Sequence, residues 1–330
     1  MALHRERLPQ LDAGLFLTDG GLETTLIYHE GVALPGFAAF PLLLEEDGRD
    51  ILRRYYESYL AVADALGVGL VLDSATWRAN PDWGARLGFQ PDDLSAVNRR
   101  AIELLAELRA ARRTTRAPLV LSGCVGPRGD GYVPGELVSA TRAADYHRAQ
   151  IETLASSGAD LVTALTLTYA DEAVGIARAA ADAGIPSVIS FTVETDGRLP
   201  SGQRLGEAIE EVDADSAAAP AYYMVNCAHP AHIEPALEAA PWVGRIKGVR
   251  ANASRRSHAE LDAATELDEG DPADLGRWCR RLRERCPHLN VLGGCCGTDH
   301  RHVEAMGRAC MGRPASGGRT GVRGGSPPPT

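Results

Sequence analysis

The chain has 330 residues and a formal net charge of −10. Hydrophobic residues make up 45% of it, enough for a sizeable core, so global disorder is excluded. The acidic balance argues against nucleic-acid binding, which needs a basic face. No apolar run approaches the roughly 20 residues that span a membrane, and the N-terminus lacks the apolar core of a signal peptide. We therefore expect a cytoplasmic protein without a nucleic-acid or membrane partner.

Short β-rich apolar runs alternate along the chain with amphipathic segments rich in Ala, Leu, Glu and Arg. The eight runs predicted as strands are Leu15–Asp19, Gly69–Thr76, Pro118–Val125, Asp160–Thr166, Ser187–Val193, Tyr222–Cys227, Arg245–Ala251 and Asn290–Gly294. Helices are predicted between them, for example at Arg53–Leu66, Leu94–Arg112, Glu136–Ser157 and Asp171–Ala183.

Strands that alternate with helices pair in parallel through right-handed crossovers, and eight such units close into a (β/α)₈ or TIM barrel. A doubly wound open sheet is the alternative, but its usual GxGxxG after the first strand is absent here. We predict one α/β barrel domain over residues 1–311. Residues 312–330 are rich in Gly, Pro, Ser and Arg without periodicity, and we predict a disordered tail there.

Active-site residues of such barrels lie at the carboxyl ends of the strands. Polar or metal-binding side chains recur at these ends in the sequence. They are Asp19, Asp73 to Thr76, Cys124, Thr166, Thr192, Asn226, Cys227, Asn252, Cys295 and Cys296.

Cysteine is the residue type that needs an explanation. The chain has seven, an odd number, and without an export signal they make a poor disulfide framework. Cys227 ends the sixth predicted strand, and the adjacent Cys295 and Cys296 follow the eighth between glycines. Three thiolates with one open position form a known zinc arrangement, and Gly293, Gly294 and Gly297 would let the backbone bend around it.

Other interpretations of these residues stay open at this point. Cys227 could be a buried core thiol, and the adjacent pair could be a vicinal disulfide or two packed thiols. His229 and His232, just after Cys227, are either further ligands or loop residues.

Several motifs resemble the homocysteine S-methyltransferase family, which includes betaine- and S-methylmethionine-dependent enzymes. The resemblance covers roughly residues 15–310. Its matching segments are Asp19–Thr24, Gly123–Pro127, Ser190–Val193, Asn226-Cys227 and Gly293–Gly297. It implies that Cys227, Cys295 and Cys296 bind Zn²⁺ and that Asp19 helps to hold an amino-acid acceptor.

The implied activity is zinc-dependent transfer of a methyl group to a small-molecule thiol, with homocysteine giving methionine as the expected reaction. A free thiol has a pKa near 8.5 and is only about 3% ionised at neutral pH, so full ionisation is worth about 2 kcal/mol. Zinc deprotonates a coordinated thiol and would act as thiol activator and template.

We predict the following site residues from the motifs and strand ends. The catalytic set is Asp19, Thr166 and Asn226, and the substrate-binding set is Asp19, Gly20, Gly21, Trp77 and Asn252. The methyl donor is expected to be a sulfonium or quaternary ammonium compound, which aromatic faces stabilise by about 0.5–2 kcal/mol. Tyr28 and Tyr169 are further aromatic candidates, and Asp73 and Glu194 could attract the donor's charge.

The chain departs from the family pattern at the predicted acceptor pocket. Leu165 stands where the family has a Glu that holds the acceptor's amino group, and residues 73–77 differ from the usual Asn-bearing stretch. Asn252 is kept in an otherwise altered segment after the seventh strand. A different thiol acceptor, or a non-catalytic zinc or thiol sensor, is therefore the alternative function.

A second alternative is a Schiff-base aldolase. It would have to use Lys247, the only lysine, which lies within the seventh predicted strand. The sequence identifies neither the methyl donor nor whether the chain forms a homo-oligomer.

Overall fold

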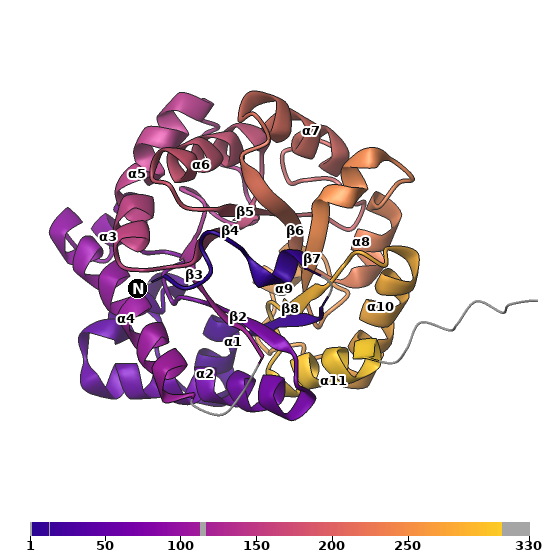
Figure 1. Cartoon of the computed structure of the whole chain (residues 1–330), viewed down its shortest axis with the longest axis horizontal. Helices are drawn as coiled ribbons and strands as arrows, with labels where there is room; N and C mark the ends of the chain where they lie inside the picture. The colour runs from indigo at the N-terminus through magenta and orange to yellow at the C-terminus, as the bar shows by residue number, and fades with distance from the viewer. Residues whose placement is uncertain (1, 13, 113–116, 312–330) are drawn as a thin grey trace, which may run out of the picture.

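In the computed structural model, eight parallel strands form a closed barrel in the order β1 to β8, with helices around it (Figure 1). The structure describes residues 2–12, 14–112 and 117–311, and the predicted tail lies outside them. The predicted (β/α)₈ barrel is confirmed, and the doubly wound alternative is wrong. The exact domain limits stay a prediction. No helix in these described ranges is both long and apolar enough to cross a membrane.

All eight predicted strands are present. Their bounds are β1 Phe16–Thr18, β2 Gly69–Asp73, β3 Leu119–Val125, β4 Leu161–Leu167, β5 Ser187–Thr192, β6 Pro220–Ala228, β7 Ile246–Ala251 and β8 Val291–Gly294. The α-helices are α1 Leu22–Thr24, α2 Glu46–Leu66, α3 Pro81–Arg86, α4 Pro91–Ala111, α5 Ala140–Ser156, α6 Ala170–Asp182, α7 Leu205–Asp215, α8 Pro230–Ala236, α9 His258–Asp262, α10 Pro272–Arg285 and α11 His300–Met311. Short 3₁₀ and π turns are η1 Pro9–Leu11, η2 Thr25–His29, η3 Pro35–Phe37, η4 Phe40–Leu44 and η5 Pro241–Arg245.

One predicted helix begins later than its sequence pattern indicates. The helix predicted from Glu136 starts at Ala140, with Ser139 as its N-cap. Gly135 has a left-handed φ of 61°, which a helix cannot contain. The freed residues extend the loop after β3, and this loop carries Tyr132 into the pocket described below.

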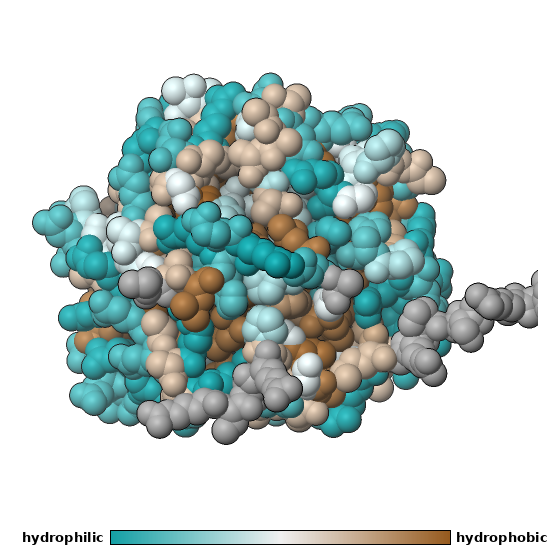
Figure 2. Space-filling view, viewed as in Figure 1, coloured by the Kyte–Doolittle hydropathy of each residue, from teal (hydrophilic) through white to brown (hydrophobic). Residues whose placement is uncertain are grey.

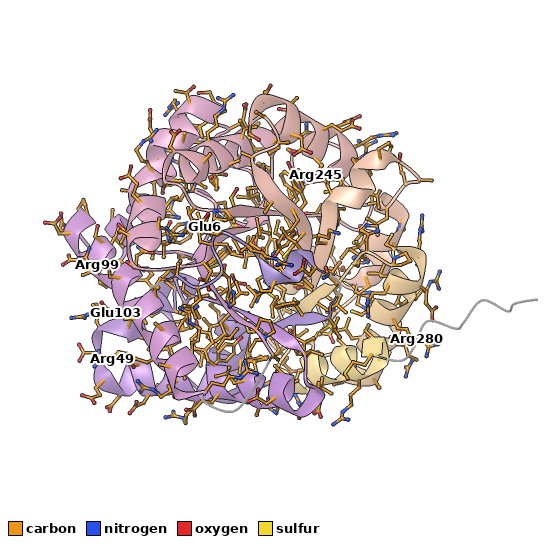
Figure 3. The ribbon with its side chains drawn as sticks, viewed as in Figure 1. Glu6, Arg49, Arg99, Glu103, Arg245 and Arg280 are labelled. Carbon is orange, nitrogen blue, oxygen red and sulfur yellow. The ribbon has the colours of Figure 1, made fainter. Side chains whose placement is uncertain are left out.

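The apolar core has two layers. Inside the barrel, side chains from the strands pack on one another, among them Phe16, Val71, Val120 and Val291. A larger cluster fills the space between the outer face of the strands and the helices. Charged residues such as Arg99, Glu103 and Arg280 point away from the barrel on the outer helices (Figure 3). This packing leaves the carboxyl ends of the strands as the place for polar groups.

The N-terminal segment crosses the end of the barrel where the strands begin (Figure 1). Leu8 packs into the inner layer, and Asp160, just before β4, accepts hydrogen bonds from the backbone N–H groups of Leu3 and His4 at 2.6 and 2.9 Å. Figure 2 shows the hydrophilic side chains of this segment over the centre of that face. The amino end of the barrel is thus covered, and the site has to open at the opposite end.

Asp160 is fully buried and also accepts from Leu121 N at 2.9 Å and Arg109 Nη1 at 2.8 Å. We expect Asp160→Ala to lower the free energy of unfolding by about 3–5 kcal/mol, because buried donors lose a charged acceptor. Urea unfolding measures this. Asp145→Ala, an exposed acid on α5, is the control and should change stability by less than about 0.5 kcal/mol. Equal effects of the two changes would contradict the role given to Asp160.

Candidate metal centre and adjoining pocket

The three predicted ligand cysteines meet at the carboxyl end of the barrel. One sulfur from each of Cys227, Cys295 and Cys296 lies within 4.8 Å of the others, and the Cys227 and Cys296 sulfurs are 3.6 Å apart. Tetrahedral zinc with Zn–S bonds of about 2.3 Å requires sulfurs about 3.8 Å apart. The donor set therefore fits a thiolate-bound metal. All seven cysteines are free, so the vicinal-disulfide interpretation is wrong.

Glycines bring the Cys295 segment against the loop after β1. A Cβ on Gly294 would lie 1.9 Å from Thr298 Oγ1, and one on Gly21 would lie 2.6 Å from the Cys295 carbonyl oxygen. Gly297 has a left-handed φ of 76°, as the predicted bend requires. Gly294 is needed because Thr298 packs directly against its backbone, and not because the chain bends there.

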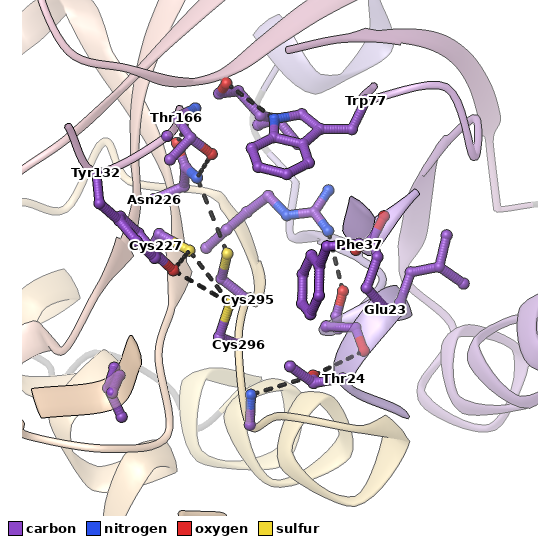
Figure 4. Close-up of a pocket in the computed structure, with 18 of the residues that line it drawn as sticks. Glu23, Thr24, Phe37, Trp77, Tyr132, Thr166, Asn226, Cys227, Cys295 and Cys296 are labelled. Atoms are coloured by element: carbon purple, nitrogen blue, oxygen red, sulfur yellow. Dashed lines mark hydrogen bonds between the residues drawn. The ribbon is translucent and has the colours of Figure 1, made fainter. Parts of the chain in front are cut away.

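Two residues of the site have strained backbone. Thr166 and Cys227 have φ values of 64° and 56°, which a non-glycine residue adopts at a cost of about 1–3 kcal/mol. Asn226 holds Thr166 from both sides: its Oδ1 accepts from Thr166 N at 2.9 Å, and its Nδ2 donates to Thr166 Oγ1 at 2.8 Å. The same Nδ2 points at the Cys295 sulfur, 3.9 Å away. Figure 4 shows this chain of contacts from Thr166 to the cysteines.

Hydrogen bonds from two side chains hold the backbone of Cys227. Its carbonyl oxygen accepts hydrogen bonds from Asn252 Nδ2 at 3.0 Å and from His258 Nε2 at 2.7 Å. The His258 ring stacks on Tyr132, with centroids 4.1 Å apart. The Tyr132 hydroxyl in turn lies 3.3 Å from the Cys227 sulfur and 3.4 Å from the Cys296 sulfur. These contacts fix the direction in which the Cys227 side chain points.

The thiols affect one another's ionisation. Hydrogen bonds from Cys227 and Cys296 hold the pKa of Cys295 well below its usual range. The pKa of Cys227 is raised, because its thiol donates to both neighbours and is buried. The pKa of Cys296 is also raised, since the bond to Cys295 and burial outweigh the lowering effect of Cys227. Without a cation, one thiolate is therefore favoured over three.

A buried arginine lies next to the cysteines. Arg250 Nη2 donates to Asp19 Oδ1 at 2.6 Å, Nη1 donates to Asp73 Oδ2, and Nε donates to the Gly294 carbonyl at 3.1 Å. Tyr55 donates its hydroxyl to the second Asp19 oxygen at 3.0 Å. Burial raises the pKa of Asp19 to about 6, although Arg250 opposes the shift. Arg250 thus ties β1, β2, β7 and β8 together at the floor of the site.

A cavity of about 390 Å³ opens above the cysteines. Most of the predicted site residues line it: Asp19, Gly20, Gly21, Trp77, Thr166, Asn226, Cys227, Cys295 and Cys296. Tyr28, Leu165 and Cys124 line it as well. Trp77 donates its indole N–H to the Leu165 carbonyl at 3.3 Å, which joins the ends of β2 and β4 (Figure 4).

Some sequence expectations are not supported by this placement. Asn252 is buried behind Cys227 and does not line the cavity, because its amide is used on the Cys227 carbonyl. Tyr169 is buried elsewhere, and its hydroxyl accepts from Val138 N. Glu194 pairs with His258, at 3.0 Å, outside the cavity lining. A contact of these three residues with substrate has no support here.

His229 precedes helix α8, whereas His232 lies in its first turn and not in a loop. His229 is the N-cap of α8, and its Nδ1 accepts from Ala231 N. Neither histidine belongs to a potential metal group within the described ranges. The remaining cysteines, Cys279, Cys286 and Cys310, are buried on or beside α10 and α11.

Sequence reasoning missed several residues of the site. Arg250 is the clearest, although a charged side chain one residue before the end of a barrel strand could have signalled it. Tyr132 lies in the loop after β3, and His258 begins the short helix α9. Hydrophobic periodicity in the sequence does not predict where either segment lies. Glu23 and Arg78 also line the cavity: Glu23 lies within the matching segment Asp19–Thr24, and Arg78 follows Trp77.

A second group of potential metal-binding atoms lies on the rim, formed by His29, Glu269 and Asp299. Arg301 pairs with both carboxylates, at 2.7 Å to Glu269 and 2.6 Å to Asp299. Both carboxylates of this group are therefore already paired with an arginine. The group connects η2 and the segment before α10 to the start of α11, where Asp299 precedes the helix and accepts from Arg301 N at 2.9 Å.

The model of the family described as homocysteine S-methyltransferase matches residues 16–310. The chain belongs to this family. It is therefore a methyltransferase, and the aldolase and non-catalytic alternatives are wrong. Lys247 does not line the cavity, which agrees with this family assignment.

Relatives and solved structures of the family extend over most of the chain. A selenocysteine Se-methyltransferase of Brassica oleracea var. italica is 25% identical, covering 91% of this chain and 90% of the relative. Homocysteine S-methyltransferase 4 of Zea mays is 26% identical, covering 90% and 89%. The oxidised form of the Escherichia coli homocysteine methyltransferase MmuM shares the fold, with a TM-score of 0.72 at 20% identity over 91% of this chain and 97% of that one.

We expect Arg250→Met to lower the free energy of unfolding by about 3–5 kcal/mol, because two buried carboxylates lose their shared partner. Chemical unfolding at neutral pH measures this. Arg280→Met, which removes an exposed pair with Glu284, is the control and should have little effect. Adding Asp19→Asn and Asp73→Asn to Arg250→Met should restore part of the stability. No loss in the single variant would contradict the account of Arg250.

Proposed function

We propose that the protein is a zinc-dependent S-methyltransferase that moves a methyl group from a sulfonium or quaternary ammonium donor to a thiol, with homocysteine as the acceptor. The observation that carries this proposal is the convergence of three free cysteine sulfurs at the base of an open cavity. Family membership and the existence of MmuM in a metallated form support it. Relatives named for methyl transfer to homocysteine or selenocysteine support the kind of acceptor.

Cys227, Cys295 and Cys296 would hold the zinc ion. When bound, zinc supplies a positive charge that keeps thiols ionised at neutral pH and a position for one more sulfur. The three cysteines carry three negative charges, so the filled centre has a net charge of −1. A sulfur held there keeps its nucleophilic character.

The chain's own residues orient the reaction. Asn226 fixes the Thr166 backbone and points its amide at Cys295, so both predicted catalytic side chains contact the cluster or its immediate neighbours. Tyr132 covers the opposite side of the cluster, over Cys227 and Cys296. The acceptor would approach the sulfurs from the cavity that all three cysteines line.

The donor is placed by the aromatic wall of the cavity. Tyr28, Phe37 and Trp77 line it, and faces of this kind attract a sulfonium or quaternary ammonium group. The acceptor thiolate attacks the methyl carbon while the donor's bond from that carbon to sulfur or nitrogen breaks. The donor then leaves neutral with the electron pair of that bond, and the acceptor becomes a neutral thioether.

We expect Cys227→Ser to abolish both bound zinc and methyl transfer to homocysteine, because a hydroxyl is a poor ligand beside two thiolates. Metal analysis of protein purified under reducing conditions, together with product assay, measures the two losses. Cys286→Ser, at the end of α10, is the matched control and should keep about one zinc per chain and full activity. A wild-type protein that holds no zinc when reduced would refute the proposal.

A further inference from the structure

Charged side chains other than the cysteines also line the cavity, and most of them already have a hydrogen-bond or ionic partner. Asp19 and Asp73 both pair with Arg250. Asp268 accepts from Ser254 Oγ at 2.6 Å. Asp262 and Glu266 are exposed at the rim. Among the described residues that line the cavity, this leaves Glu23 without an ionic partner and Arg78 with a loose pair to Asp130 at 3.6 Å.

Arg78 is a buried cation with few contacts. The residue is only 8% exposed, and its guanidinium lies between the rings of Trp77 and Trp83, at 4.5 and 3.4 Å from their centroids. Its nearest carboxylate within the described chain is Asp130, at 3.6 Å, which is beyond a good hydrogen bond. Its Nε finds no partner in the described residues.

A guanidinium has five N–H donors in a planar fork that suits a carboxylate. Burying such a group without acceptors is costly, and desolvation lowers the pKa of Arg78. Stacking between two indoles holds the plane of the guanidinium in place but supplies no acceptor. An oxyanion that enters the cavity would supply one.

Glu23 is the complementary group. It lies in α1, directly after the loop that carries Asp19, and no hydrogen bond or ion pair joins its side chain to another described residue. Burial raises the pKa of Glu23 to about 7, and Glu23 and Arg78 line the same cavity. Figure 4 shows Glu23 on the side of the cavity opposite Cys227 and Tyr132.

We propose that Arg78 binds the carboxylate and Glu23 the ammonium group of an α-amino acid acceptor whose thiol reaches the three cysteines. This rests on the proposed function, which supplies the acceptor. It assigns two side chains to the charged ends of the substrate and explains how the pocket selects an amino acid with Leu165, an apolar residue, on its wall. A thiol that lacks one charged end leaves the matching side chain without its partner.

The test compares three acceptors at a saturating concentration of one methyl donor. Homocysteine has both charged groups, 3-aminopropanethiol lacks the carboxylate, and 4-mercaptobutanoate lacks the ammonium group. We expect Arg78→Met to lower kcat/KM for homocysteine by about 10- to 100-fold, the range of a charged hydrogen bond, and to change that for 3-aminopropanethiol much less. Glu23→Gln should affect homocysteine in the same way and spare 4-mercaptobutanoate.

Matched controls are available nearby. Arg86 also stacks on Trp83, at 4.4 Å, but does not line the cavity. Glu30 follows Glu23 by seven residues and does not line it either. Arg86→Met and Glu30→Gln should leave all three acceptors unchanged.

Because the ratio between acceptors is taken within one variant and one donor, an effect on the donor cancels. Equal losses for homocysteine and the truncated thiols would overturn the assignment. If the wild-type protein methylates none of the thiols, the proposed function fails, and calorimetric binding of L-methionine then decides this inference alone. Binding by the wild type that weakens at least about 10-fold in Arg78→Met supports the inference. No binding, or no difference between the two proteins, overturns it.

Discussion

The constraint on which this site depends is the mutual repulsion of three neighbouring thiolates. Their sulfurs lie within 4.8 Å of one another, and like charges at that distance oppose full ionisation. A dication between them removes this penalty, whereas the metal-free cluster has to share protons. The barrel supplies the geometry in advance. Cys227 has a left-handed backbone conformation, and Asn252 and His258 hold it there by donating hydrogen bonds to its carbonyl oxygen.

The pairing of charged side chains also organises the rest of the pocket. One arginine, Arg250, pairs with two carboxylates, Asp19 after β1 and Asp73 at the end of β2, and reaches the backbone of β8. These shared contacts make the floor of the site rigid. Glu23, which has no ionic partner among the described residues, and Arg78, whose pair with Asp130 is 3.6 Å long, lie on the walls, where a ligand can reach them. Hydrogen bonds thus hold the metal-binding end in place against its backbone strain, and the cavity walls keep the groups that distinguish one substrate from another.

Much of this could be predicted from the sequence, for a physical reason. Parallel strands bring their carboxyl ends to one edge, so Cys227 and Cys295 could be placed together from strand ends alone. What could not be predicted depends on side-chain direction and loop path. Asn252 ends a strand yet turns behind the site, and Tyr132 arrives from a loop that Gly135 separates from its helix. Periodicity carries no information on either point.

The central claim is that the three cysteines hold zinc and leave one position for the acceptor's sulfur. X-ray absorption at the zinc edge of the reduced protein tests it most directly. We expect three sulfur ligands at about 2.3 Å without substrate and four after homocysteine is added. A sulfur count that does not increase with homocysteine, or a first shell with fewer than three sulfurs at the start, would contradict the account.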